Sequence, residues 1–233
     1  MMRSPTFSLD IETRDLTGDQ VAFESQFLKA HPSTKDPGKI EKQLAEKEKK
    51  LVEKGGLTDS CEIASIGIHT RNSLPLVLHT FPFDETLEEE YCVQHRAYQN
   101  EREMLYAFYH EMSTACDDET EIIVAGRDFD FPKIRMRCVV NGVPIPSPLY
   151  PGAGNPTYDV LFMATRYYLT GKRFSVGLDE LSQRLGVDTG DKALSGARVP
   201  EMIKEERYKE VIVYNGLDAY KNTECYNKMT CRY

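Results

Sequence analysis

The feature that most constrains the fold is an alternation of apolar and polar residues over positions 7–13, F-S-L-D-I-E-T. A period of two is typical of a β-strand with one apolar face. Asp10 and Glu12 then point to the same side of this strand, with their Cα atoms about 6.5–7 Å apart. Two neighbouring carboxylates repel each other, so they either face solvent at a strand end or bind a divalent cation. Because D-x-E is common on strands, this stretch alone favours the solvated pair.

The composition is that of an ordinary globular protein, with 40% hydrophobic and 28% charged residues in a chain of 233. No apolar run reaches the roughly 20 residues that span a bilayer, and we see no signal peptide, so we expect a cytoplasmic protein without a membrane partner. The six cysteines show no C-x-x-C spacing, which favours reduced thiols over a zinc site. A net charge of −8 argues against tight binding of nucleic acid through Lys and Arg, but not against phosphate binding through metal ions.

The expected strands come first and the helices dominate the second half, which is typical of one α/β domain with a mixed sheet. Further strands are expected over 61–70 and 73–81, as an antiparallel hairpin, and over 121–124. Helices are expected over 37–54, 101–115, 129–141, 158–169, 178–185 and about 200–228. The segments 13–36, 85–90, 143–156 and 187–198 are read as polar stretches or loops. The helix 37–54 is either a solvated surface helix, which its charge favours, or a lysine-rich arm beside a substrate cleft.

A further carboxylate, Asp130, follows the apolar strand and precedes Pro132, where the next helix is expected to begin. Aspartate is favoured as an N-cap, and taken alone this is the preferred interpretation. Alternatively, Asp130 is displayed at the end of a central strand, where α/β proteins usually build their sites. The two roles are compatible. Asp159 is interpreted mainly as a helix-start residue.

Tyr214 and Asp218 form an i,i+4 pair if their segment is helical. The phenol could then orient a water next to a metal ion that the carboxylate binds. Alternatively, Tyr214 packs on the core and Asp218 is solvated. Gly216 between them costs about 1 kcal/mol relative to Ala in a helix, and marks either the close approach of another backbone or a weak point.

These three stretches together resemble the three exonuclease motifs of the DEDD (DnaQ-like) 3′–5′ exonuclease superfamily. The matching residues are Asp10-x-Glu12, Phe129-Asp130-x-Pro132 and Tyr214-x-x-x-Asp218, in that order. The tyrosine points to the DEDDy branch. More narrowly, S-L-D-I-E-T and G-R-D-F-D-F-P resemble stand-alone exonucleases similar to the proofreading domain of family B DNA polymerases.

The resemblance covers roughly residues 6–228 and includes two departures. Val124-Ala125 stands where that group often has Trp-Asn or Phe-Asn, and Leu217 stands where a polar residue usually precedes the last aspartate. Neither departure removes one of the four carboxylates or the tyrosine. They therefore bear on substrate preference and turnover and not on the metal site.

The resemblance implies a ribonuclease-H-like fold, that is, an α/β fold with a mixed central sheet flanked by helices. It also implies one exonuclease domain over 1–233, with a charged helical insertion at about 36–56. Asp10, Glu12, Asp130 and Asp218 would hold two divalent ions, Mg²⁺ or Mn²⁺, and Tyr214 would complete the catalytic set by orienting the attacking water. The implied reaction removes nucleoside 5′-monophosphates from the 3′ end of DNA, from single-stranded or frayed ends.

Several alternatives stay open at this stage. The chain could be a ribonuclease-H-like endonuclease, an RNA-directed exonuclease or a non-catalytic nucleic-acid-binding module. The oligomeric state is not predicted. Aromatic candidates for stacking on bases are Phe129, Phe131, Tyr167 and Tyr168, and basic candidates for phosphate contact are Arg127, Lys133, Arg135 and Arg137, although a solvated helix face explains the basic residues equally well.

Overall fold

The computed structural model describes residues 5–53, 60–71, 73–168, 176–187 and 196–232. Within these residues, one mixed sheet of six strands has the order β4-β3-β2-β1-β5-β6. The strands are β1 (Thr6–Thr13), β2 (Ile63–Thr70), β3 (Leu76–His79), β4 (Gln94–Ala97), β5 (Glu121–Val124) and β6 (Thr157–Asp159). The predicted α/β architecture, with a mixed central sheet flanked by helices, is therefore confirmed.

Strand β1 confirms the strand predicted from the alternating sequence, and it lies in the interior of the sheet between β2 and β5. It pairs antiparallel with β2, where Asp10 lies opposite Gly67, and parallel with β5, where Phe7 lies opposite Ile122. Strand β2 also pairs antiparallel with β3, which confirms the predicted hairpin. The outer strands β4 and β6 run parallel to β3 and β5.

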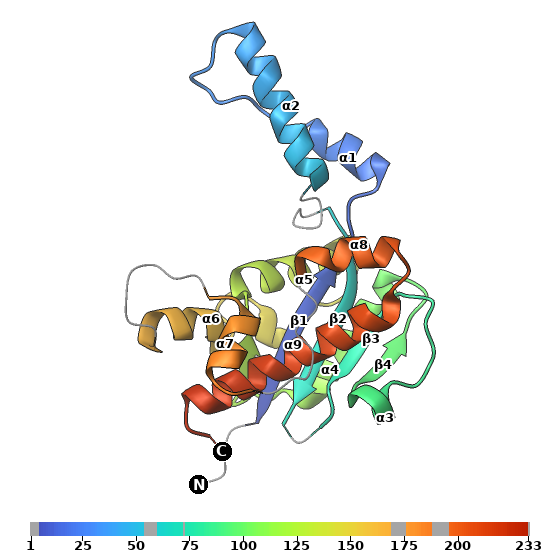
Figure 1. Ribbon diagram of the computed structural model, residues 1–233, viewed down its shortest axis with the longest axis vertical. Coiled ribbons are helices and arrows are strands. Elements are labelled where there is room, and N and C mark those ends of the chain that lie inside the picture. The colour runs from blue at the N-terminus through green and yellow to red at the C-terminus, as the bar shows by residue number, and fades with distance from the viewer. Residues whose placement is uncertain (1–4, 54–59, 72, 169–175, 188–195, 233) are drawn as a thin grey trace.

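Helices cover both faces of the sheet (Figure 1). On one face, α4 (Glu101–Ala115) and α5 (Arg127–Asn141) pack on the apolar side chains of β1 in one core cluster. On the other face, α9 (Tyr208–Met229) crosses β1 and β2, with α7 (Leu178–Arg184) and α8 (Val199–Lys204) beside it. The polar side chains of β1 therefore face α9.

Two glycines allow α9 to lie directly on the sheet. A Cβ atom at Gly67 in β2 would lie 2.4 Å from the backbone oxygen of Asn215, and one at Gly216 would lie 2.9 Å from a methyl group of Val93. Both distances are shorter than real Cβ contacts, so a side chain at either position would push the helix away. Of the two explanations offered for Gly216, a close approach applies, but the atoms that approach it belong to side chains and not to another backbone. The close contact with a backbone is made at Gly67.

Helices α1 (Gly18–Ser25) and α2 (Pro37–Glu53) form an arm that projects away from the sheet, beyond the end of β1 (Figure 1). Helix α2 was predicted, and the Asp36 side chain caps it by accepting a hydrogen bond from Lys39 N at 3.0 Å. Helix α1 was missed because its 8 residues carry no buried side chain, although Thr17 and Gln20 form a capping box. The Gly55-Gly56 pair, predicted to end α2, lies outside the described residues.

Three other predictions were wrong in their details. The expected helix 200–228 is two helices, α8 and α9, because the chain turns at Glu206 with a φ of 58°. Tyr158 and Asp159 belong to strand β6, and the helix after them is α6 (Val160–Met163), followed by a π-helical turn over Ala164–Tyr168. The segment 85–90 is not only a loop, since α3 (Glu88–Tyr91) begins within it and leads into β4.

Helix α7 and the left-handed Gly186 after it agree with the predicted helix 178–185. No helix among the described residues is long and apolar enough to cross a membrane. Much of the predicted loop 187–198 lies outside the described residues.

Candidate active site

Strand β1 and helix α9 bring Asp10, Glu12 and Asp218 into one acidic cluster. Asn215 of α9 donates a hydrogen bond through Nδ2 to Asp10 Oδ2 at 2.8 Å. Burial raises the pKa of Asp10 well above its usual value, and the negative charge of Asp218 raises it further. Burial likewise raises the pKa of Glu12, followed by the charges of Asp10, Asp218 and Asp130. The carboxylates on β1 are therefore not a solvated pair.

Asp130 joins this cluster from the other side of β1, but it is not the N-cap of its helix. Helix α5 begins at Arg127, three residues earlier than Asp130, and Gly126 precedes it with a φ of 123°. The N-cap prediction for Asp130 was wrong because another carboxylate performs that function. Asp159 Oδ2 accepts hydrogen bonds from Gly126 N at 3.2 Å and Arg127 N at 3.0 Å.

Asp159 also caps α6, since its Oδ1 accepts from the backbone N–H groups of Leu161 and Phe162, both at 3.0 Å. Its predicted role at a helix start is confirmed, and it joins the starts of two helices. Asp130 is 4% exposed, and within the part of the chain that the structure describes its buried Oδ2 atom has no hydrogen-bond partner.

A carboxylate oxygen in a buried acidic site has the donor chemistry that hard cations prefer. Burial raises the pKa of Asp130, and the charges of Asp10 and Asp159 add to this rise. A buried carboxylate that is neither paired nor bound to a metal is costly. A hard cation with oxygen ligands, such as Mg²⁺ or Mn²⁺, would satisfy Asp130 and offset the repulsion between it and its neighbours.

Asp218 is 5% exposed, so the alternative that it is solvated is wrong. Lys221, one turn later on α9, donates to Asp218 Oδ1 at 2.7 Å and to Asp179 Oδ1 on α7 at 2.7 Å. The sequence interpretation missed Lys221, although its i,i+3 spacing from Asp218 is that of an ion pair on one helix face. It also missed Asn215, which only the packing of α9 on β1 brings to Asp10.

The Tyr214 hydroxyl lies within the same cluster. A Cβ atom at Gly196 would lie 3.3 Å from Tyr214 Oη and 4.0 Å from Glu12 Oε1, so the chain entering α8 passes beside both groups. Burial raises the pKa of Tyr214, and the charges of Asp218 and Glu12 raise it further. The hydroxyl consequently stays protonated at neutral pH.

The geometry fits a metal site in its donor chemistry, but the side chains are not arranged around one point. Within the described ranges, no three His, Cys, Asp or Glu side chains converge closely enough to hold one metal ion. Two of the oxygens concerned are engaged by other groups, Asp10 Oδ2 by the Asn215 amide and Asp218 Oδ1 by the Lys221 ammonium. At these two oxygens, a metal ion would therefore compete with the Asn215 amide and the Lys221 ammonium.

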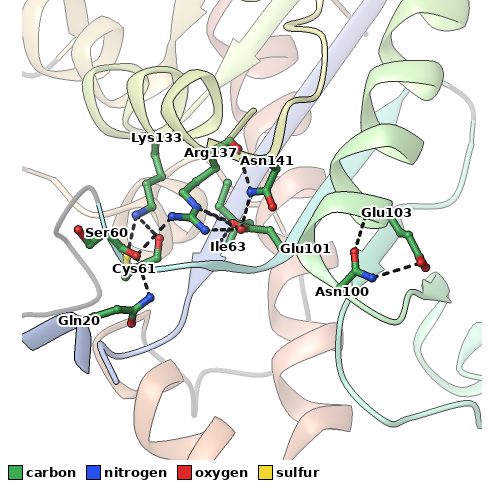
Figure 2. A network of polar contacts seen from close by, with 10 residues as sticks. All are labelled: Gln20, Ser60, Cys61, Ile63, Asn100, Glu101, Glu103, Lys133, Arg137 and Asn141. Atoms are coloured by element: carbon green, nitrogen blue, oxygen red, sulfur yellow. Dashed lines mark hydrogen bonds and ion pairs between the residues drawn. The ribbon is translucent and has the colours of Figure 1, made fainter. Parts of the chain in front are cut away.

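Two of the basic residues considered for phosphate contact are buried in a separate network. Lys133 and Arg137 of α5 are buried, and Figure 2 shows them pointing toward Cys61 and Glu101. They are neither phosphate contacts nor a solvated face, so both alternatives were wrong for them. Arg127 remains half-exposed beside Asp128. Among the aromatic candidates, Phe131 is part of the core and Tyr167 is exposed.

A comparison of the chain with models of protein families finds no match, and neither does a comparison with curated proteins. The assignment of a function therefore depends on the carboxylate cluster itself. Its distinguishing property is that acidic groups from β1, α5 and α9 lie close enough to raise one another's pKa values, and that among the described residues the buried Oδ2 atom of Asp130 has no hydrogen-bond partner.

Proposed function

We propose that this protein is a metal-dependent 3′–5′ exonuclease that hydrolyses phosphodiester bonds at the 3′ end of DNA and releases nucleoside 5′-monophosphates. The observation that carries the proposal is the cluster of Asp10, Glu12, Asp130 and Asp218. These residues come from three segments that are far apart in the sequence, yet the charges of the other three all raise the pKa of Glu12. Perturbed carboxylates of this kind concentrate at functional sites.

The topology of the sheet supports the proposal. Strands β1 to β3 form an antiparallel meander, and β5 and β6 continue the sheet parallel to β1. This arrangement is compatible with the ribonuclease-H-like fold that the motif resemblance implies. Asp10 and Glu12 lie toward the carboxyl end of β1, and α5 with Asp130 begins directly after β5, at the same edge of the sheet.

In this proposal, the four carboxylates hold two divalent ions, Mg²⁺ or Mn²⁺. Two such ions, when bound, stabilise the attacking and leaving oxygens of a phosphodiester during in-line displacement. Tyr214 orients the attacking water through its hydroxyl group. Because its pKa is raised, the phenol acts as a neutral hydrogen-bonding group and not as the base that takes the proton.

The test is a time course with 3′- and 5′-labelled single-stranded and duplex DNA and RNA, with Mg²⁺, Mn²⁺ or chelator. We expect stepwise shortening from the 3′ end of DNA, dependent on metal and absent in Asp10→Ala. Asp128→Ala is the matched control, since the Asp128 side chain is 96% exposed and lies two residues from Asp130. An Asp10→Ala protein that degrades the substrate at the wild-type rate would exclude the proposal. Cleavage of a circular single strand would indicate an endonuclease, and a preference for RNA would indicate an RNA-directed enzyme.

A further inference from the structure

A buried lysine lies inside the acidic cluster. Lys221 is 4% exposed, and its Nζ atom is 5.7 Å from the centre of the Tyr214 ring. Burying an ammonium group is costly unless it is paired. Lys221 is paired twice, with Asp218 on its own helix and with Asp179 on α7, both at 2.7 Å.

The position of Lys221 gives it an electrostatic role across the site. Burial raises the pKa values of Asp10 and Asp218, and the positive charge of Lys221 opposes that rise for both carboxylates. The ammonium therefore acts on residues of both β1 and α9. Its contact with Asp218 Oδ1 engages the carboxylate that the proposed function assigns to a metal ion.

We propose that Lys221 is an internal counter-cation, which holds Asp218 in the metal-free protein and competes with a divalent ion for that carboxylate. This inference rests on the proposed function, because it assumes that Asp218 is a metal ligand. Lys221 is then a positioning residue that sets the metal affinity of the site. It contacts neither substrate nor the reacting atoms.

Asp179 makes such an exchange feasible. Its side chain is 46% exposed, whereas Asp218 is buried, so the two partners of Lys221 lie in different environments. When Asp218 turns toward a metal ion, the ammonium keeps its ion pair with Asp179 and is not left buried without a partner. The divalent ion replaces Lys221 at Asp218, and two positive charges do not have to share one carboxylate oxygen.

The experiment compares the wild-type full chain with Lys221→Met and Lys221→Gln by calorimetric titration of Mn²⁺ and by thermal unfolding in chelator. Methionine preserves the length and removes the charge, and glutamine also preserves a hydrogen-bond donor. Lys209→Met is the matched control, because Lys209 is on the same helix but pairs with Glu90 at the surface. In chelator, both Lys221 variants should unfold at a lower temperature than the wild type. Both should bind Mn²⁺ about tenfold more tightly, since a like charge a few ångströms from the ion is removed.

An unchanged or weaker Mn²⁺ affinity in the Lys221 variants, beside clear binding by the wild type, would overturn the inference and leave the proposed function intact. If no protein in the series binds Mn²⁺, the metal site itself is wrong and both proposals fail. If Lys221→Met does not fold, Lys221→Gln decides, because its amide can still donate to Asp218. A purely structural lysine would lower the unfolding temperature without changing the Mn²⁺ affinity.

Discussion

Helix α5 contributes to two buried acidic sites that differ in how their charge is satisfied. On one side, Glu101 of α4 accepts hydrogen bonds from Arg137 Nε at 2.9 Å, Asn141 Nδ2 at 2.8 Å and Ile63 N at 2.8 Å (Figure 2). On the other, Asp130 belongs to a cluster of carboxylates, and its buried Oδ2 atom has no hydrogen-bond partner among the residues that the structure describes. Helix α5 therefore contributes Arg137 to a network that neutralises a carboxylate, and Asp130 to a cluster in which carboxylates repel one another.

The difference is between a carboxylate whose charge the fold itself satisfies, Glu101, and the carboxylates of the proposed active site. The Glu101 carboxylate is satisfied within the fold, because an arginine, an amide and a backbone N–H all donate hydrogen bonds to it. The cluster around Asp10 has charge and hydrogen-bonding capacity left for a ligand. If the proposed function is correct, we expect this cluster to lower the stability of the metal-free fold, a cost that functional sites commonly carry. The following predictions test this contrast, beginning with the largest expected effect.

Removing a carboxylate from the functional cluster should abolish hydrolysis and preserve the fold. We expect Asp218→Ala to lower the rate of DNA degradation at least about a thousandfold, because losing several kcal/mol of metal-derived stabilisation costs a factor of ten per 1.4 kcal/mol. The measurement is single-turnover cleavage of a 5′-labelled oligonucleotide, with circular dichroism to confirm folding. Residual activity within tenfold of the wild type would remove Asp218 from the site.

Breaking the Glu101 network should have the opposite effect. The free energy of unfolding should fall, while the folded protein should hydrolyse DNA at an unchanged rate. Arg137→Ala leaves Glu101 buried without its ion pair, which typically costs about 3–5 kcal/mol. Arg96→Ala breaks an exposed pair with Glu111 and should cost at most about 1 kcal/mol. Urea unfolding measures both variants. An equal loss of unfolding free energy in the two variants would show that Arg137 does not neutralise a buried Glu101 carboxylate.

Tyr214→Phe should produce a smaller effect, confined to the chemical step. The ring and its packing remain, but the hydroxyl that orients water is lost, so we expect a rate about tenfold to a hundredfold lower. Mn²⁺ affinity should not change, because Tyr214 is not a proposed ligand. Tyr208→Phe, on the same helix but stacked on Phe81, serves as control. An unchanged rate for Tyr214→Phe would exclude it from the mechanism.

The smallest expected effect is a pH-dependent gain in stability. The folded-state pKa of Asp130 is raised, so the folded protein holds this proton more tightly than the unfolded chain. The contribution of this proton to stability is complete at pH values below the pKa of Asp130 in the unfolded chain. It is lost as the pH rises through the pKa of Asp130 in the folded protein. Asp130→Asn should therefore raise the unfolding temperature of the chelated protein at pH 8, by about 2–4 °C per kcal/mol gained, and change it less at pH 5.

The control for this prediction is Asp128→Asn, which changes an exposed carboxylate in the same helical turn. It should leave the unfolding temperature unchanged at both pH values. Destabilisation by Asp130→Asn at pH 8 would mean that Asp130 is a satisfied structural group, like Glu101.

Local patterns were enough to predict strands β1, β2, β3 and β5 and the candidate acids, but not the outer strands β4 and β6. Strand β1 follows from the alternation over 7–13, and helix α4 matches its predicted bounds because its apolar residues recur at helical spacing. The positions of Asp10 and Glu12 on one strand face followed from the same pattern. These features depend on residues that are close in sequence.

Long-range contacts account for what the sequence did not predict. Asp159 replaces Asp130 as the cap of α5 from 32 residues away, so no local rule could assign that role. Asn215 reaches Asp10 from a position 205 residues later, and the packing of α9 on β1 and β2, close to Gly67, places it there. The burial of Lys133 and Arg137 likewise depends on partners in other elements.

Calorimetric titration of Mn²⁺ into the wild-type protein and into Asp10→Ala tests the central claim most directly. If the carboxylate cluster is under-neutralised because it binds divalent cations, the wild type should bind Mn²⁺ and Asp10→Ala should lose that binding. Absence of Mn²⁺ binding by the wild type, or equal binding by Asp10→Ala, would contradict the account.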